Sequence, residues 1–430
     1  MNSSAIPVFD VAVIGAGPAG IAAAVSASES GARVALLDDN PRPGGQIWRG
    51  GPAAAHKGEA RSWFDRLGKS PVSIFHNACV FHLEPGALSA ESGDTVLQLS
   101  YRNLILATGA RELFLPFPGW TLPNVMGAGG LQALVKSGLP INDKRVVIAG
   151  TGPLLLAVAA YLRHAGAKVL AVCEQAPWIR FLRFGASISL LPGKFRQAAE
   201  MSLELAGIPF WANCWPIAAE GKGCLESVQV SRGGKIRSVA CDYLACGFHL
   251  VPNVELARMA GCNLHEGFVV ADDFQRTTVP NIYCAGEPTG IGGLELSLLE
   301  GQIAGYIATH WEGAARKLFE KRATFRRAVA LLKQSCELRP ELKALAKPDT
   351  LVCRCEDVSL ERLAAHDSWR AAKLQTRCGM GPCQGRVCGA AARFLFDWEM
   401  DSARPPVFPV KCSSLAAVGA AAGESNGGSR

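Results

Sequence analysis

Apolar residues form a short run at 9–14, and this run ends directly in a cluster of glycines. A run of that length bounded by glycine predicts a buried β-strand followed by a tight turn. Small and apolar residues continue over 21–30 with the composition of a helix, and a second apolar run over 33–37 stops at Asp38. The order strand, turn, helix, strand indicates a βαβ unit with parallel strands.

The same order of elements recurs in the middle of the chain. The pattern predicts a strand over 145–149, a glycine turn, a helix over 153–164 and a second strand over 168–172. Two such units without a shared sequence repeat indicate a duplication of fold rather than of sequence. The predicted fold class is therefore α/β, with two Rossmann-like units.

Beyond these units the pattern changes twice. Helical periodicity with added charges extends over 294–345 and breaks at Lys347-Pro348. A cysteine-rich segment follows over 353–388, and the tail from 413 is rich in alanine, glycine and serine, which predicts an extended and partly disordered end. Three further apolar runs that end in small turn residues are expected to be strands, at 101–106, 243–245 and 281–285.

The charge and its distribution along the chain argue against a nucleic-acid partner. The chain has 430 residues, enough for two or three domains, and a formal net charge of +7. Its densest basic run, 316–327, is interleaved with Glu320 and apolar residues, which is typical of a solvated helix face. We therefore expect no nucleic-acid partner.

The chain contains 15 cysteines but shows neither a basic leader followed by an apolar run nor an apolar stretch long enough to span a membrane. Cysteines without a secretory signal favour a reducing compartment, where they are buried singly or hold a metal. The expected location is cytoplasmic.

The first glycine cluster has the spacing of a dinucleotide-binding turn. Gly15 allows the tight turn, Gly17 lets the backbone approach a pyrophosphate, and Gly20 lets helix and strand pack closely. The intervening Pro18 and Ala19 begin the helix, whose N-terminal N–H groups face the phosphates. Asp38 ends the next strand, where it is placed to accept hydrogen bonds from an adenosine ribose.

Later motifs resemble those of the two-dinucleotide-binding-domain flavoproteins, which include the glutathione- and thioredoxin-reductase types. The motifs are Gly44-Gly45-Gln46, Ala107-Thr108-Gly109 and Gly286-Glu287. The resemblance covers about the first 310 residues and implies that the first unit binds FAD, with Gly45, Gln46, Thr108, Gly109, Gly286 and Glu287 in contact with it. Aspartate is usual where this chain has Glu287. Cysteines of this part of the sequence, including Cys241 and Cys246 at C-x4-C spacing, are better explained as small buried hydrophobic residues than as a redox-active pair, so disulfide reduction is not expected.

The second glycine turn keeps two of the three glycines, Gly150 and Gly152, and has Leu155 where the third would stand. Glu174 ends the following strand and could bind a ribose, as an acid does for NAD. Two interpretations stay open: an NADH site, or a retained fold that binds another adenine nucleotide or nothing.

The C-terminal cysteines have spacings that suit a metal centre. Cys353-Arg354-Cys355 is followed by Cys378, and Cys383 precedes Cys388 by five positions. Thiolates converging from glycine-rich turns are typical of iron–sulfur clusters, whereas structural zinc sites usually show paired C-x2-C spacing. The pattern favours an iron–sulfur cluster over zinc. Pro382 suits a helix start, which would place Cys383 near a positive helix end.

The phrases C-R-C-E-D and T-R-C-G-M-G-P-C-Q-G-R-V-C resemble the bacterioferritin-associated-ferredoxin type of [2Fe–2S] domain. This resemblance implies that the ligands are Cys353, Cys355, Cys383 and Cys388. Cys378 is a fifth cysteine without an assigned role.

Together with the phrase D-N-P-R-P-G-G-Q-I at 39–47, these motifs resemble one family over nearly the whole chain. It is the A (alpha) subunit of heteromeric amino- and imino-acid dehydrogenases, such as opine oxidase, hydrogen cyanide synthase and D-hydroxyproline dehydrogenase. The resemblance implies a partner, an oxidase-like flavoprotein beta subunit, which oxidises a small amino or imino acid and passes electrons to this chain. D-hydroxyproline is the substrate that we expect first.

The same resemblance allows further features. An FMN at a subunit interface could be an additional cofactor, the complex could lie at the periphery of the inner membrane, and a quinone or cytochrome chain fits as acceptor. We identify no catalytic base, since His249 is better explained as a structural histidine. The alternative function is a stand-alone NADH-dependent flavin and iron–sulfur reductase.

The domains expected are an FAD domain at 1–140 and 266–310, an inserted NAD(P)-binding-like domain at 141–265, a helical linker at 311–347, a [2Fe–2S] domain at 348–400 and a tail at 401–430.

Overall fold

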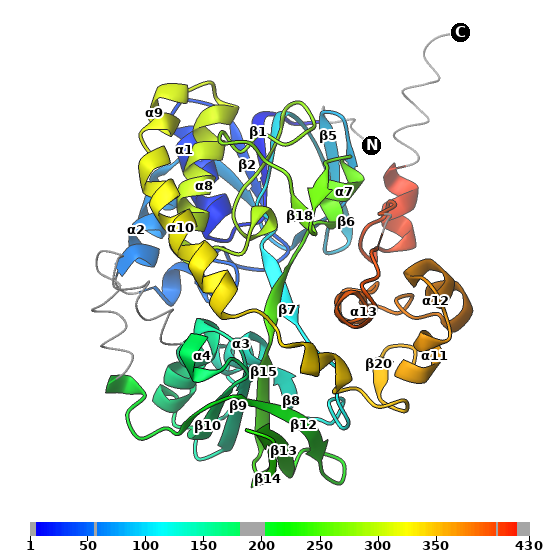
Figure 1. Ribbon diagram of the computed structural model, residues 1–430. Helices are drawn as coiled ribbons and strands as arrows, with labels where there is room; N and C mark the ends of the chain where they lie inside the picture. Colours follow the sequence, from blue (N-terminus) through cyan, green and yellow to red (C-terminus); the bar gives the residue numbers. More distant parts are fainter. Residues whose placement is uncertain (1–5, 56–57, 181–202, 401–402, 419–430) are drawn as a thin grey trace. The chain divides into compact units, whose positions relative to one another are not determined.

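The computed structural model describes residues 6–55, 58–180, 203–400 and 403–418. The chain divides into two compact units, each built from separate stretches of sequence (Figure 1). Unit one comprises Met1–Arg111, Pro252–Arg326 and Ser402–Arg430, and unit two comprises Glu112–Val251 and Arg327–Asp401. The chain first passes into unit two within β7 (Ala110–Leu113) and returns within β16 (His249–Pro252).

A seven-stranded sheet forms the centre of unit one. Its parallel part aligns the carboxyl ends of neighbouring strands, because Ile14 lies opposite both Leu37 and Leu106, and Leu106 lies opposite Cys284. The turns that follow these strands therefore gather at one edge of the sheet, where ligands bind in this class of fold. The parallel strands are β1 (Val8–Ile14), β2 (Val34–Leu37), β3 (Val72–Phe75), β6 (Thr95–Leu106) and β19 (Ile282–Cys284), and the antiparallel ones are β4 (Ala78–Glu84) and β5 (Ala87–Ser92).

Two helices of unit one pack against each other at close range, α1 (Pro18–Ser28) and α8 (Gly293–Ala308), as Figure 1 shows. A Cβ atom on Gly301 or Gly305 would fall 2.1 or 2.3 Å from a backbone oxygen of α1, so only glycine permits this approach. The contact holds the start of α1 at the sheet edge. The remaining elements of unit one are η1 (Gly51–Ala53), α2 (Gly58–Lys69), α7 (Glu255–Met259), β17 (Leu264–His265), β18 (Phe268–Val269), η2 (Glu287–Thr289) and α9 (Glu312–Arg316).

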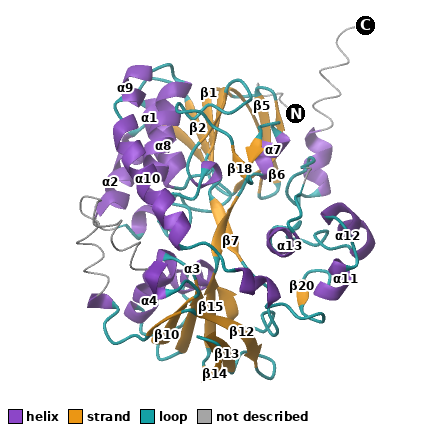
Figure 2. Cartoon of the chain, viewed as in Figure 1, coloured by secondary structure: helices purple, strands orange, loops and turns teal. Residues whose placement is uncertain are grey.

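Unit two contains a parallel five-stranded sheet in the order β11-β10-β9-β15-β8, followed by an antiparallel sheet of three strands. Helices α3 and α4 lie beside the parallel strands of this sheet (Figure 2). Strand β15 is buried along its whole length, as expected for a strand covered on both faces. The elements are β8 (Val125–Gly127), α3 (Ala128–Lys136), β9 (Arg145–Gly150), α4 (Pro153–His164), β10 (Lys168–Glu174), β11 (Phe210–Ala212), β12 (Cys214–Glu220), β13 (Ser227–Arg232), β14 (Lys235–Ala240) and β15 (Tyr243–Gly247).

The cysteine-rich segment, which we call the cysteine module (residues 348–400), belongs to unit two. Leu342 and Leu345 lie in the apolar core of unit two, and Val387, Ala390 and Phe394 of the module pack against the same core. The module is therefore anchored to unit two by apolar contacts. Its elements, with those of the segment leading to it, are α10 (Phe319–Ser335), η3 (Pro340–Ala344), β20 (Leu351–Cys353), β21 (Val358–Ser359), α11 (Leu360–Ala364), α12 (Trp369–Thr376) and α13 (Cys388–Phe396).

The described part of the C-terminal tail lies on unit one. The Val407 N–H donates to the Phe81 carbonyl oxygen at 3.1 Å, and Lys411 binds Asp94 with an Nζ–Oδ1 distance of 2.5 Å. We call residues 403–411 the C-terminal strap. Residues 412–418 are helical, so the described part of the tail is more ordered than its composition predicts. Among the described residues, no helix is both long and apolar enough to cross a membrane.

Candidate cofactor sites

The first glycine turn has the geometry of a phosphate cradle. Gly15 has φ +103°, and a Cβ there would lie 2.3 Å from the Ala107 oxygen, while a Cβ on Gly20 would lie 1.7 Å from the Gly15 oxygen. Gly17 is different, because its Cβ would meet only the Gly45 Cα, at 4.0 Å. The backbone at Gly17 thus faces free space at the start of α1, where a pyrophosphate would fit.

Asp38 lies beside this turn and is almost fully buried. One carboxylate oxygen accepts the N–H of Ala16, and the other accepts the backbone N–H and the side-chain amide of Asn40, both at 2.8 Å. A carboxylate offers about four acceptor positions, so capacity for a ribose hydroxyl remains. The predicted ribose acceptor is therefore held next to the predicted phosphate cradle.

The loop with Gly45 and Gln46 closes over the same turn. The Gly44 N–H donates to the Ala16 oxygen at 2.7 Å, and Gly45 has φ +58°. A Cβ on Gly45 would lie 3.0 Å from the Gly17 Cα. Glycine at position 45 therefore suits both this backbone conformation and the close approach of the two loops. The side-chain oxygen of Gln46 accepts a hydrogen bond from Arg49 at 3.1 Å.

A residue that the sequence did not single out, Asn253, supports the turn at Thr108 and Gly109. The Thr108 hydroxyl donates to the Asn253 carbonyl oxygen at 2.6 Å, and the Asn253 amide donates back to the Thr108 carbonyl at 2.9 Å. The Asn253 N–H also donates to the Gly109 oxygen, at 2.9 Å. The two residues are 145 positions apart, so only the fold reveals this partnership.

Glu287 follows Gly286 at the same sheet edge and caps helix α8. Its carboxylate accepts the N–H groups of Gly292 and Gly293 at 3.2 and 3.0 Å. Burial raises the pKa of Glu287 to about 7, although these two hydrogen bonds act in the opposite direction. The predicted flavin residues Gly15, Gly17, Pro18, Ala19, Gly20, Asp38, Gly45, Gln46, Thr108, Gly109, Gly286 and Glu287 all lie in unit one.

The second glycine turn donates hydrogen bonds to Glu174, the acid at the end of the following strand. The Glu174 carboxylate accepts the Thr151 hydroxyl at 2.6 Å, the Gly152 N–H at 2.8 Å and the Ala176 N–H at 2.9 Å. Gly150 has φ +145°, and a Cβ there would lie 2.0 Å from the Gly247 oxygen. Burial raises the pKa of Glu174. The predicted ribose acceptor of the second unit is therefore buried and already bonded to three donors.

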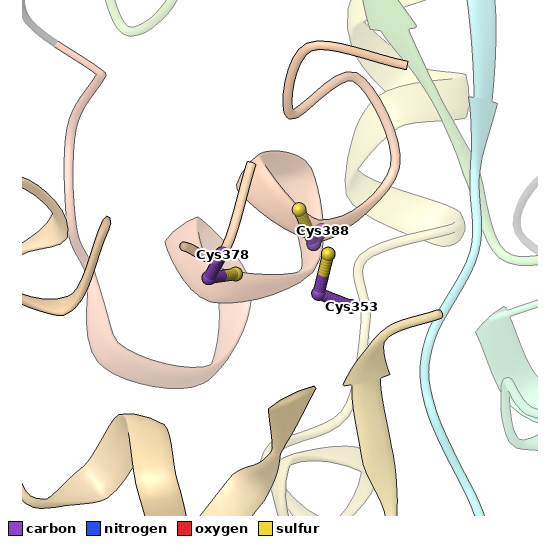
Figure 3. Close-up of side chains that lie close together, drawn as sticks. All are labelled: Cys353, Cys378 and Cys388. Atoms are coloured by element: carbon purple, nitrogen blue, oxygen red, sulfur yellow. The ribbon is translucent and has the colours of Figure 1, made fainter. Parts of the chain in front are cut away.

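The cysteine module brings thiols together. The Sγ atoms of Cys353, Cys378 and Cys388 all lie within 4.8 Å of one another, and Figure 3 shows these side chains gathered between β20 and α13. Cys383 continues this group through thiol contacts with Cys388 and with Cys355. The group of five cysteines includes all four predicted ligands, Cys353, Cys355, Cys383 and Cys388. The fifth cysteine, Cys378, is one of the three whose sulfurs lie within 4.8 Å of one another.

Hydrogen bonds favour thiolates at two of these sulfurs. Contacts with the Cys378 and Cys388 thiols, followed by N–H groups of Gly379 and Glu356, lower the pKa of Cys353 to about 2. The Cys388 thiol is likewise the main cause that lowers the pKa of Cys383, to about 5. Thiolate donors supported by backbone N–H groups fit an iron–sulfur cluster or a zinc ion.

The prediction that a helix starts at Pro382 is wrong. Helix α13 begins at Cys388, with Val387 at its N-cap, so Cys388 rather than Cys383 lies at the helix N-terminus. The segment before it forms turns, with positive φ at Gln384 and Gly385. These turns direct the Gly385 and Val387 N–H groups toward the Cys383 sulfur.

Comparisons with known proteins agree with this geometry. Residues 9–312 match the model of the pyridine nucleotide-disulphide oxidoreductase family. The chain belongs to this family. It is also 32% identical to the A (alpha) subunit of opine oxidase from Agrobacterium tumefaciens, over 95% of this chain and 91% of that protein. It is 33% identical to hydrogen cyanide synthase subunit HcnB of Pseudomonas aeruginosa, over 87% of this chain and 90% of that protein.

Two solved structures show the same fold. L-proline dehydrogenase from P. horikoshii has a TM-score of 0.67 and 21% identity, covering 96% of this chain and 81% of that one. Thioredoxin reductase from T. acidophilum has a TM-score of 0.50 and 22% identity, covering 74% of this chain and 99% of that one. The resemblance to the A (alpha) subunits of opine oxidase and its relatives and the two-domain flavoprotein fold are thus confirmed, and the chain is a flavin-dependent oxidoreductase of the FAD-binding type.

Replacing Glu287 by glutamine is expected to flatten the pH dependence of stability in the flavin-depleted protein. The folded pKa of Glu287, about 7, lies above the unfolded value of 4.5, so the folded state binds the proton more tightly. Stability is therefore full below the unfolded pKa and falls as pH rises toward the folded pKa, by roughly 3 kcal/mol in total. Glutamine still accepts from Gly292 and Gly293 but does not ionise.

Urea unfolding at about pH 5 and about pH 8 checks this expectation. The free energy of unfolding of the wild-type chain should fall more between the two pH values than that of Glu287→Gln. Glu320→Gln, at an exposed position, is the matched control and should behave as the wild type. An equal fall in wild type and Glu287→Gln would contradict the assignment.

Proposed function

We propose that this chain is the FAD- and [2Fe–2S]-containing subunit of a heteromeric amino- or imino-acid dehydrogenase. An oxidase-like flavoprotein beta subunit oxidises the substrate, and this chain passes the electrons on to an acceptor. The observation that carries the proposal is the group of thiols in the cysteine module. The relatives of this chain are named as subunits, of opine oxidase and of hydrogen cyanide synthase.

The carboxyl groups at the flavin edge support a role in holding the cofactor rather than in transferring substrate protons. The buried Glu300 accepts the N–H of Gly286 at 3.1 Å and the Thr289 hydroxyl at 3.0 Å, and it pairs with Arg326 at 3.0 Å. Glu287 and Asp38 are likewise bonded to backbone N–H groups. We assign no catalytic base to this chain, and substrate oxidation falls to the beta subunit.

The residues on this chain then have positioning roles. FAD, when bound, supplies the exchange of electrons between a two-electron donor and a one-electron cluster. The first glycine turn would hold its pyrophosphate, Asp38 would accept a hydrogen bond from the ribose, and Glu287 would lie at the ribityl chain. The N–H groups that point to Cys353 and Cys383 stabilise the thiolates that hold the cluster, for which we keep the ligand set Cys353, Cys355, Cys383 and Cys388.

A cyclic imino acid is the substrate class that we favour, with D-hydroxyproline first. The relatives named as opine oxidase support oxidation of an amino or imino acid, and the choice of a cyclic one rests on the resemblance to the D-hydroxyproline dehydrogenases. Anaerobic visible spectra test the function. With the beta subunit present, D-hydroxyproline should bleach the flavin and cluster bands of this chain. Bleaching by NADH alone would instead establish the stand-alone reductase.

Trp120 is expected to secure the cluster through strand β20. Its indole N–H donates to the Leu351 carbonyl oxygen at 2.6 Å, and the Arg354 guanidinium lies 5.7 Å from the centre of its ring. Trp120→Phe keeps an aromatic ring but leaves the Leu351 carbonyl without this donor, at a cost of about 1–2 kcal/mol. A chelator should therefore remove iron from the variant faster, by about fivefold to thirtyfold.

The chelator experiment has a matched control in Trp311→Phe, which changes a half-exposed tryptophan of unit one. This control should lose iron at the wild-type rate. Equal rates in Trp120→Phe and wild type would show that the indole hydrogen bond does not secure the cluster.

A further inference from the structure

The second glycine turn differs from the first because a side chain, that of Cys336, lies against it. In unit one, a Cβ on Gly17 would approach only another glycine, at 4.0 Å. In unit two, a Cβ on Gly152 would meet the Cys336 Sγ at 3.4 Å. The thiol of Cys336 also hydrogen-bonds to the Thr151 side chain. A residue from the segment leading to the cysteine module thus occupies the place where a phosphate would approach Gly152.

Gln175, which is fully buried, ties the following residues to the same turn. Its side-chain amide donates to the Thr151 hydroxyl oxygen and to the Glu337 carbonyl oxygen, both at 3.1 Å. Its side-chain oxygen accepts the Arg339 N–H at 3.2 Å. The amide of Gln175 therefore bridges the glycine turn and residues 336–339, which we call the linker segment.

Further contacts fix both ends of the linker segment. The His249 ring hydrogen-bonds to the backbone of Cys336. At the other end, Arg339 binds the side chain of Asn213 and lies over the ring of Trp215, with its guanidinium carbon 4.9 Å from the ring centre. These partners come from three different strands or turns of unit two, so the linker segment is held across the end of the parallel sheet.

The linker segment is what distinguishes the two glycine turns. In both units the acid at the end of the second strand is buried and accepts three hydrogen bonds, one of them from an N–H of the glycine turn. In unit two, the side chain of Cys336 also faces the glycine that a pyrophosphate would approach. We infer that residues 336–339 of the chain itself, and not a nicotinamide dinucleotide, occupy the nucleotide cleft of unit two.

This inference gives unit two a different task from that of its fold relatives. Its cleft serves as a docking site for the segment that leads to the cysteine module, and the module packs on the core of the same unit. The inference does not depend on the substrate or on the beta subunit. It predicts that NADH cannot deliver electrons through unit two.

A disulfide trap tests the occupancy in the full-length protein with its cofactors. Thr151→Cys places a thiol where the Thr151 hydroxyl meets Cys336, and oxidised glutathione under anaerobic conditions should link the two residues. Mass analysis of unreduced peptides identifies the link, and Thr151→Cys/Cys336→Ser is the control that cannot form it. Addition of millimolar ADP-ribose, which carries the adenosine and pyrophosphate of NADH, should leave the rate of linking unchanged.

Two outcomes would overturn the inference. A Thr151→Cys protein that stays unlinked while the flavin band is intact would show that the linker segment lies elsewhere. Linking that ADP-ribose slows by about tenfold or more would show that a nucleotide displaces the segment. A second measurement needs no substitution: in the wild-type protein, iodoacetamide should modify Cys336 at least about tenfold more slowly than the exposed Cys224. Equal rates for the two cysteines would also overturn it.

Discussion

Replacing Cys353 by serine is expected to remove the iron–sulfur cluster and to stop electron transfer through the chain, while FAD stays bound. Cys353 belongs both to the ligand set implied by the ferredoxin resemblance and to the compact group of three sulfurs. The loss of one thiolate ligand removes the strongest donor type for iron, and this loss is confined to unit two. Iron content, the cluster absorption and the flavin absorption of the purified variant check this result.

Three further serine variants make the experiment specific. Cys412→Ser changes an exposed cysteine outside the module and should keep its iron. Cys355→Ser should lose the cluster if the ferredoxin-type ligand set is correct, whereas Cys378→Ser should keep it with an altered spectrum. The reverse pattern would assign the fourth position to Cys378. A Cys353→Ser protein with full iron content would contradict an iron–sulfur centre at this position.

Replacing Gly17 by alanine is expected to weaken FAD binding by at least about tenfold, or ~1.4 kcal/mol, without unfolding the protein. A Cβ at this position meets only the Gly45 Cα at 4.0 Å, so the folded chain accommodates it. The backbone of Gly17 has φ −74°, which any residue can adopt. The added methyl group instead occupies the space that the pyrophosphate needs. FAD titration of the flavin-depleted protein measures the effect.

Two glycine variants bracket this prediction. Gly68→Ala in helix α2 meets no atom within 4 Å and should bind FAD as the wild type does. Gly20→Ala should fail to fold properly, because its Cβ would lie 1.7 Å from the Gly15 backbone oxygen. If Gly17→Ala bound FAD with wild-type affinity, the pyrophosphate would not lie against this glycine.

Local sequence signals were sufficient to predict which turns gather at the sheet edge of unit one. The register of parallel strands brings Gly15, Asp38, Thr108 and Gly286 to one edge, and each of these residues directly follows or nearly follows a strand that the apolar pattern predicts. The helix of the cysteine module was misplaced because proline favours a first helical turn but does not require one. In the structure, the turns around Cys383 and Gly385 take precedence over that preference.

Long-range packing explains what the sequence could not reveal. Cys336 contacts Thr151, Asn253 contacts Thr108, and Trp120 contacts Leu351, in each case across more than a hundred positions. Nothing in the immediate neighbourhood of these residues marks them. Cys378 carried a signal, since it was an extra cysteine in a metal-type pattern, but spacing alone could not say whether its sulfur turns toward the others.

The C-terminal strap has a consequence for the order in which the protein is made. The strap and the short helix after it lie against β4 and β5 of unit one, where Lys411 of the strap and Ser414 of the helix bind Glu91 from more than 300 positions away. During synthesis, all of unit two must emerge from the ribosome before this edge of unit one can close. Contacts of such large sequence separation form late and slowly. Unit one therefore begins to fold before unit two, but its contacts with the C-terminal residues form only after unit two has been synthesised.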